Sequence, residues 1–152
     1  MGKNTLRETV YAFNNTNTVE TYDIDMDVWH PNRIKMASIV CEILPFDRAE
    51  HLRFLDLGAG TGYLSHKIIE IFPNATIVAV DAAELMIDKA KLRLKNHLEQ
   101  VTFQLSTFQE LPNTMKDLSH IDAVVSSFAL HHLYKEEKEF LFRYIHSILK
   151  PH

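Results

Sequence analysis

The sequence predicts an α/β fold with a mainly parallel sheet, and two observations support this prediction. First, short apolar runs of strand length alternate along the chain with segments of helical periodicity. Alternation of this kind produces parallel strands that are joined by right-handed helical crossovers. Second, three of the four glycines lie within five positions directly behind the first apolar run, where a strand would turn into a helix.

The strands are expected where several consecutive residues are apolar, because parallel strands are buried on both faces. These runs are residues 54–57, 76–80, 101–105 and 121–126. Helices are expected where apolar residues recur at the spacing of one helix face. The helical segments are residues 62–72, 84–95 and 135–149, together with a helix that begins at Pro31 and is stopped by Pro45.

Length and composition indicate a single soluble globular domain. The chain has 152 residues, of which 46% are hydrophobic and 24% are charged. Residues 1–20 are polar and are expected to form a flexible N-terminal segment, which leaves residues 21–152 as the folded domain. The formal net charge of −4 argues against a large surface for nucleic acid.

The same features predict a cytoplasmic location. Cys41 is the single cysteine, so no intrachain disulfide can form and an oxidising compartment gains no support. The N-terminus lacks the basic start and apolar stretch of a secretory signal. The longest apolar runs are too short to cross a membrane.

The glycine cluster predicts a binding site for a nucleotide-like ligand. Gly58, Gly60 and Gly62 stand at the exit of the first predicted strand. Glycine permits the sharp turn and lets a ligand approach the bare backbone, and the following helix offers unpaired N–H groups. Ligands of open α/β sheets bind at the carboxyl ends of the strands. The alternative is a tight turn without a ligand.

An acid at the end of the second strand fits the same ligand. Asp81 follows the glycine cluster by about twenty residues, where an acid takes the ribose hydroxyls of a bound nucleotide. The alternative for Asp81 is a solvated or helix-capping acid. The dinucleotide fingerprint G-x-G-x-x-G is not complete, because Tyr63 occupies its sixth position.

Together these motifs resemble the class I S-adenosylmethionine-dependent methyltransferases. The resemblance is to the small-molecule branch, of the ubiquinone/menaquinone-biosynthesis type, and runs from about Tyr22 to the C-terminus. It implies a Rossmann-like three-layer fold with visible strand order 3-2-1-4 and S-adenosyl-L-methionine as the cofactor. The motifs that carry it are Leu55-Asp56-x-Gly58-x-Gly60-x-Gly62, Val80-Asp81 with Met86, Leu111-Pro112, Ser126 with Leu130-His131-His132-Leu133, and Leu149-Lys150-Pro151.

The resemblance assigns the glycine turn to the methionine part and the ribose of the cofactor. The backbone of Gly58, Gly60 and Gly62 would lie along these groups, with Ala59 in the same turn. Asp56 would orient the turn and help to hold the amino group of the cofactor.

The next loops would hold the nucleoside end. Asp81 would bind both ribose hydroxyls, while Ala82 and Met86 would flank the adenine. Thr107, followed by Phe108, stands where the family often has an acid that receives the adenine amino group. A threonine hydroxyl can accept that hydrogen bond without the charge.

The loop after the fourth strand would complete the site. The backbone around Ser126 and Ser127 would help to hold the methionine end, and Tyr22 resembles a lid residue that closes over the cofactor. His131 and His132 are the candidate catalytic bases, and a scaffold role is the alternative for both. No spacing of histidines with carboxylates predicts a metal site.

The chain is shorter than the family fold, which continues through a fifth strand and usually an antiparallel hairpin. The sequence stops at Pro151-His152, so the C-terminal strands are expected to be missing and the fourth strand to form an open edge. A truncation, a natural short form and completion of the edge by another chain all fit, and the stop at a family boundary favours a fragment. Homo-oligomerisation through this edge is one expectation.

The predicted function is transfer of a methyl group to a small organic acceptor. Two alternatives stay open: a non-catalytic cofactor-binding module or partner subunit, and an NAD- or FAD-binding domain of an oxidoreductase. The missing glycine at position 63 weighs against the second alternative. The sequence does not separate methylation of carbon, oxygen and nitrogen.

Overall fold

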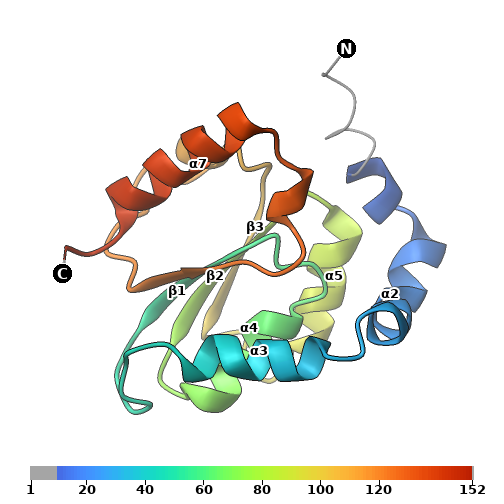
Figure 1. The fold of residues 1–152 in the computed structure, drawn as a ribbon, viewed down its shortest axis with the longest axis horizontal. Coiled ribbons are helices and arrows are strands. Elements are labelled where there is room, and N and C mark those ends of the chain that lie inside the picture. The colour runs from blue at the N-terminus through green and yellow to red at the C-terminus, as the bar shows by residue number, and fades with distance from the viewer. Residues whose placement is uncertain (1–9, 152) are drawn as a thin grey trace.

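The fold of the chain is given by a computed structural model that describes residues 10–151. One sheet of four parallel strands, in the order β3-β2-β1-β4, forms its centre (Figure 1). This arrangement confirms the predicted fold class and strand order. The strands are β1 Arg53–Leu57, β2 Thr76–Asp81, β3 Val101–Leu105 and β4 Ala123–Val125.

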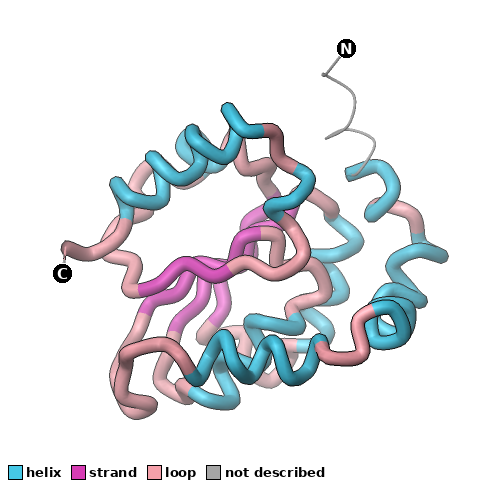
Figure 2. The backbone as a smooth tube through the Cα atoms, in the orientation of Figure 1, coloured by secondary structure: helices cyan, strands magenta, loops and turns pink. Residues whose placement is uncertain are grey.

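Helices cover both faces of the sheet and produce three layers (Figure 2). Figure 1 shows α7 on one side of the sheet and α3 with α4 on the other, while α2 lies beside α5. Residues 10–13 are also helical. The bounds are α2 Thr16–Trp29, α3 Arg33–Glu42, α4 Tyr63–Ile71, α5 Glu84–Arg93, α6 Leu111–Thr114 and α7 Lys135–Ile148, with a 3-10 turn, η1, at Leu130–His132.

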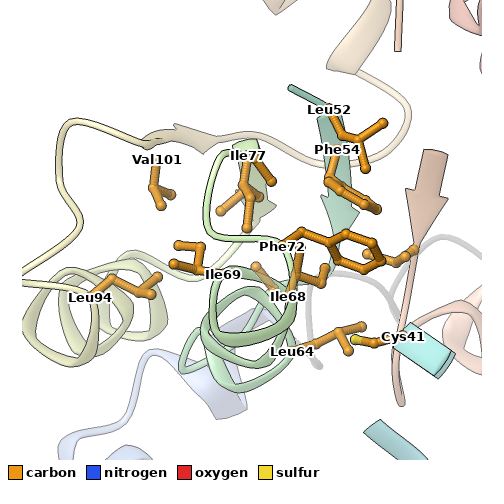
Figure 3. Close-up of a cluster of buried hydrophobic side chains, with 14 of the residues drawn as sticks. Cys41, Leu52, Phe54, Leu64, Ile68, Ile69, Phe72, Ile77, Leu94 and Val101 are labelled. Atoms are coloured by element: carbon orange, nitrogen blue, oxygen red, sulfur yellow. The ribbon is translucent and has the colours of Figure 1, made fainter. Parts of the chain in front are cut away.

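Alternate residues of the strands supply two separate cores. On one face, Phe54 of β1 and Ile77 of β2 are register neighbours and pack on Ile68 and Phe72 from α4 and its end (Figure 3). The rings of Phe54 and Phe72 have centroids 5.6 Å apart. Burial of such side chains from water is the main stabilising contribution to the fold, at about 2 kcal/mol each.

The opposite core has the same construction. Leu55 and Val78, the next register pair along β1 and β2, face Leu111 of α6 and Leu141 of α7. Because both faces of each central strand are buried, the strands read as continuous apolar runs in the sequence. The apolar runs from which the three-layer fold was predicted therefore reflect the burial of both faces of the central strands.

The largest difference from the prediction lies in the fourth strand, which was expected over residues 121–126. The β4 ladder is limited to three residues that pair with β1. Ile121 instead forms an isolated parallel bridge with Leu149, and the Lys150 N–H donates to the Ile121 carbonyl at 2.9 Å. At the other end, the Ser126 hydroxyl donates to the Leu57 carbonyl at 2.7 Å, where the chain leaves the ladder.

The N-terminal boundaries also differ from the prediction. The expected domain boundary at residue 21 falls inside α2, and residues 16–20 form the beginning of that helix. The Asn15 side chain accepts hydrogen bonds from two backbone N–H groups of the first turn, which explains the start of the helix. The next helix begins at Arg33 and not at Pro31. Residues 10–13 of the predicted flexible segment are helical as well, and residues 1–9 lie outside the described residues.

The carboxyl ends of the strands meet at one edge of the sheet, where α2 is also anchored. Val19 of α2 packs with Ala83 and Met86 at the beginning of α5, next to the end of β2. This packing holds α2 close to the loops that follow the strands. Within residues 10–151, no helix combines the length and the apolar character that crossing a membrane requires.

Candidate functional site

The glycine turn joins β1 to α4 and is fixed to the end of β2. The N–H groups of Gly58 and Ala59 both donate to the Val80 carbonyl, each at 2.9 Å. Gly58 and Gly60 adopt left-handed backbone conformations, with φ of +70° and +53°. L-residues with a side chain adopt this conformation at a cost of about 1–2 kcal/mol, so the sequence places glycine here.

The three glycines face different surroundings. A Cβ on Gly58 would lie 2.2 Å from the Cβ of Ala129, so the loop after β4 depends on a bare backbone at this position. A Cβ on Gly62 would lie 3.1 Å from the Cβ of Ala90 in α5. A Cβ on Gly60 would meet no atom within 4 Å. Only Gly60 therefore has free space above it, and Gly62 serves the packing of α4 against α5.

Asp81 holds the glycine turn from the end of β2. Its Oδ2 accepts the Gly60 N–H at 2.8 Å, and its Oδ1 accepts the Ala83 N–H at 2.9 Å. Burial raises the pKa of Asp81, and backbone N–H groups at Ala83, Gly60 and Ala82 partly offset this effect. Each carboxylate oxygen keeps a second lone pair, so Asp81 can still accept two hydroxyl groups from a ligand.

A cavity of about 720 Å³, counted to its open mouth, lies between this turn, α2 and the loops after β2, β3 and β4. It brings together eight of the predicted cofactor-binding residues from five segments of the chain. These are Tyr22, Gly58, Gly60, Asp81, Ala82, Met86, Thr107 and Phe108. The lining is mostly apolar, with Asp81 as its carboxylate.

A second cavity of about 440 Å³ continues the first on the other side of the glycine turn. The two share five lining residues, Tyr22, Gly58, Gly60, Ser127 and Phe128, so they form the halves of one cleft. The second half adds the predicted residues Asp56 and Ala59. Arg33 and Thr61 also line it.

Three predicted site residues do not line either half of the cleft. Gly62 faces α5, as described above. Ser126 turns its hydroxyl to the β1 backbone, and its neighbour Ser127 lines both halves instead. His131 is exposed and lies outside the lining, whereas His132 is part of it.

The two histidines contact each other at the mouth of the cleft. Their ring centroids are 3.8 Å apart, and the ring of Phe13 lies 6.4 Å from that of His132. Partial burial, with a smaller contribution from His131, lowers the pKa of His132. A neutral imidazole at neutral pH can accept a proton. Among residues 10–151, no three histidines, cysteines or acids gather in a way that could hold a metal ion.

Several residues of the cleft were not predicted from the sequence, among them Arg33, Thr61 and Phe128, and Ser127 was assigned only through its backbone. Arg33 is only 6% exposed, although it carries a charge. Phe128 has a left-handed φ of +54°, which is rare for an aromatic residue, and its ring lies 4.5 Å from that of His30. Backbone strain of this kind concentrates at functional sites. The residues next to Phe128 form no sequence motif that predicts its left-handed conformation.

Thr107 lines the cleft, and its hydroxyl is already hydrogen-bonded to Glu110. Its Oγ1 donates to Oε2 of Glu110 at 2.8 Å and accepts the Glu110 N–H at 3.3 Å. The proton of this hydroxyl is therefore directed away from the cleft toward Glu110. The remaining lone pair of this oxygen is still available to a ligand amino group.

Asp56 is the most deeply buried acid of the site. It is 1% exposed, and its Oδ2 accepts the hydroxyl of Ser65 at 2.7 Å. Burial raises the pKa of Asp56 to about 6, against the Ser65 hydrogen bond and with a smaller contribution from Asp81. A cation in the second half of the cleft would stabilise the ionised carboxylate and lower this pKa again.

Asp56→Asn should remove a pH-dependent contribution to stability. The folded pKa of Asp56 exceeds the ordinary unfolded value, so its contribution is fully present below about pH 4 and is lost as the pH rises through about 6. Relative to the unsubstituted chain, the unfolding free energy of the variant should rise by up to about 3 kcal/mol between pH 4 and pH 7. Denaturant unfolding at several pH values measures this difference. A difference that stays constant with pH would contradict the assignment.

Known proteins resemble the chain in both sequence and fold. Residues 54–152 match the family model described as methyltransferase domain. A 66-residue segment is 44% identical to malonyl-[acyl-carrier protein] O-methyltransferase of Bacillus cytotoxicus, and covers 43% of this chain and 22% of that protein. The matched part of the chain thus spans about a fifth of this curated relative.

Two solved structures share the fold at low sequence identity. A cyclopropane synthase from Mycobacterium tuberculosis superposes with a TM-score of 0.65 at 16% identity, over 78% of this chain and 39% of that one. A methyltransferase from Thiobacillus denitrificans, in complex with S-adenosyl-L-homocysteine, gives 0.60 at 18% identity, over 77% and 44%. The strand order and the glycine turn of the structure are consistent with the family match, which covers more than half of the chain. The chain belongs to the methyltransferase domain family.

Proposed function

We propose that the chain binds S-adenosyl-L-methionine and forms the cofactor-binding part of a methyltransferase for a small organic acceptor. The observation that carries this proposal is the order of charged groups along one cleft. Asp81 lies in one half, Asp56 and Arg33 lie in the other, and the glycine turn lies between them. This order matches a ligand with ribose hydroxyls in the middle and an amino-acid group at one end.

The first half of the cleft suits the nucleoside. Asp81 has two lone pairs for the ribose hydroxyls, and Met86 and Phe108 offer apolar surface to a purine ring. Ala82 lies in the same wall. The Thr107 oxygen supplies one acceptor for an exocyclic amino group.

The second half suits the amino-acid end, which carries both an ammonium and a carboxylate. Asp56 is the acid on this side, and the cation-induced fall of its pKa would favour ammonium binding. Arg33 lines the same half of the cleft, and its positive charge, held by Asp23 and Asp27, would attract the ligand carboxylate. A purely nucleotide ligand would have no need for such a pair of opposite charges.

The chain's own residues would position the acceptor and remove its proton. When bound, S-adenosyl-L-methionine would supply an electrophilic methyl group on a sulfonium. Tyr22 and Phe128 border both halves of the cleft, so they limit the access of water to the junction. His132, held neutral by its lowered pKa, is the candidate base for an acceptor that loses a proton.

An oxygen acceptor is the first to test. The relative with 44% identity is named as an O-methyltransferase that acts on a malonyl-[acyl-carrier protein]. We therefore infer a carboxylate oxygen of an acyl chain as the acceptor. We also propose that this protein is located in the cytoplasm. Such an acceptor is already ionised at neutral pH and needs no base, so exchange of His132 for glutamine should leave its methylation largely intact.

Binding of S-adenosyl-L-homocysteine, the expected product, tests the proposed cofactor. Calorimetric titration of the chain should give a dissociation constant in the micromolar range, and NAD at the same concentrations should give no heat. Tyr63 at the sixth fingerprint position, and the opposite charges of Arg33 and Asp56 in the second half of the cleft, predict this preference. Binding of NAD but not of S-adenosyl-L-homocysteine would instead support the oxidoreductase alternative. Binding without any methyl transfer would support the non-catalytic module.

Self-association is a separate proposal that the sheet edge suggests. Of the residues described, only residues 148–150 pair with the outer side of the fourth-strand segment, at Ile121. The unpaired backbone groups of β4 could receive a strand from a second chain. Light scattering over a range of concentrations should then give a mass that rises from one chain to two.

A further inference from the structure

Five residues from α2, α3, the glycine turn, α4 and α5 meet beside the cleft and form what we name the Asp23 cluster. Its members are Asp23, Arg33, Thr61, Tyr63 and Arg93. Asp23 lies at the centre. Its Oδ1 accepts the Thr61 hydroxyl at 2.8 Å and the Arg33 guanidinium at 2.9 Å, and its Oδ2 accepts Arg93 at 2.6 Å.

These hydrogen bonds differ from a surface ion pair because Arg33 and Thr61 are buried. The side chain of Arg33 is 7% exposed and Thr61 is 2% exposed, while those of Asp23 and Arg93 are about one quarter exposed. The Arg33 guanidinium also lies 4.1 Å from the centre of the Tyr63 ring. Exposed pairs contribute little, but removal of one partner from a buried pair leaves an uncompensated charge and is costly.

The cluster joins α2 to the turn that binds the cofactor in the proposed function. Thr61 lies between Gly60 and Gly62, and it contacts Asp23 across 38 positions of sequence. Tyr22, the residue before Asp23, borders both halves of the cleft. A fixed Asp23 therefore fixes the position of Tyr22 over the glycine turn.

We propose that Asp23 is a positioning residue, which fastens α2 over the cleft through Thr61, Arg33 and Arg93 and so slows the release of the cofactor. This inference rests on the proposed function. Asp23 does not line the cleft, so it acts through Tyr22 and Arg33, which do. Loss of its charge should loosen α2 while the sheet and its two cores stay intact, because the partners of this carboxylate, Arg33, Thr61 and Arg93, belong to neither core.

Asp23→Asn and Asp27→Asn form a matched pair of variants. Both residues lie on α2, both contact Arg33, and each exchange removes one negative charge. Asp27 is 53% exposed and its hydrogen bond to Arg33 is longer, at 3.4 Å. Within residues 10–151, its side chain pairs with Arg33 and with no residue of the glycine turn or α5. Thr61→Val is a third variant, because it removes one hydroxyl and keeps all charges.

Hydrogen exchange of the full chain without ligand gives the first readout. Asp23→Asn should accelerate exchange in α2 by about tenfold and leave β1 and β2 unchanged, and Asp27→Asn should alter α2 by less than about threefold. Equal exchange in α2 for Asp23→Asn and the unsubstituted chain would overturn the proposal. Acceleration that extends equally to β1 would also overturn it, since Asp23 would then serve general stability.

Stopped-flow measurement of S-adenosyl-L-homocysteine binding gives the second readout. Asp23→Asn should raise the dissociation rate constant about tenfold with little change in the association rate constant. Thr61→Val should have a smaller effect in the same direction, and the double variant should be no worse than Asp23→Asn alone. An unchanged dissociation rate with a loosened α2 would overturn the role in cofactor release. If the unsubstituted chain binds no S-adenosyl-L-homocysteine, the proposed function fails, while the exchange comparison still decides whether Asp23 fastens α2.

Discussion

Asp81→Asn is expected to weaken binding of S-adenosyl-L-homocysteine by at least about 100-fold, which corresponds to about 3 kcal/mol. The amide would replace two charge-assisted acceptors for ribose hydroxyls. It would also direct an NH₂ group at the N–H of Gly60 or Ala83, because both carboxylate oxygens accept backbone hydrogen bonds in the folded chain. Two donors that face each other displace the glycine turn, so the cleft itself would change shape. Calorimetric titration measures the loss.

Asp88→Asn is the matched control for this exchange. Asp88 lies on α5 and is 58% exposed, and its ion pair within the described part of the chain is with Lys91 on the same helix. Its exchange removes the same charge and should alter the dissociation constant by less than about twofold, because exposed pairs contribute little. Equal effects of the two exchanges would mean that Asp81 acts through net charge and not through contact with the ligand.

Gly58→Ala is expected to lower the unfolding free energy by about 3 kcal/mol. Part of this cost comes from the left-handed backbone, with φ of +70°. The larger part comes from overlap, because the new Cβ would lie 2.2 Å from the Cβ of Ala129. The loop after β4 would have to move away from the glycine turn, and with it Phe128 and Ser127 at the junction of the cleft. Denaturant unfolding measures the effect.

Gly60→Ala separates backbone strain from overlap. Gly60 has a similar φ of +53°, but a Cβ added at this position would meet no atom within 4 Å. Its exchange should therefore cost only about 1 kcal/mol of stability. The methyl group would project into the cleft, however, so binding of S-adenosyl-L-homocysteine should fall by at least about tenfold. The same stability loss for both variants would show that the contact with Ala129 is not maintained in solution.

The sequence predicted the central part of the fold because the local signals there agree. In β1, continuous burial, a following glycine turn and an amphipathic helix all indicate the same strand–turn–helix unit. The end of the sheet was harder to predict. Residues 121–126 are apolar enough for a full strand, but the ladder is cut short where Leu149 pairs with Ile121 and where the Ser126 hydroxyl bonds to Leu57. These partners lie far away in sequence.

The candidate site likewise has residues whose positions the sequence predicts and residues whose positions it does not. Positions that depend on the β1–α4 turn and the end of β2, such as Gly60 and Asp81, could be placed from spacing alone. Arg33 and Asp23 could not, because their meeting with Thr61 and Arg93 depends on how α2 and α3 dock against the rest of the chain. An apolar or charged pattern on one helix does not specify which distant side chain it will contact.

The most direct test of the proposed cofactor site is to observe the glycine turn itself during titration with S-adenosyl-L-homocysteine. Glycine-selective ¹⁵N labelling gives a simple spectrum, since the chain has four glycines. We expect large shifts of the amide signals of Gly58 and Gly60, which line the cleft, and a smaller shift of Gly62, which packs against Ala90. NAD should cause none of these shifts. Unchanged Gly58 and Gly60 signals at millimolar S-adenosyl-L-homocysteine would contradict the proposed cofactor site.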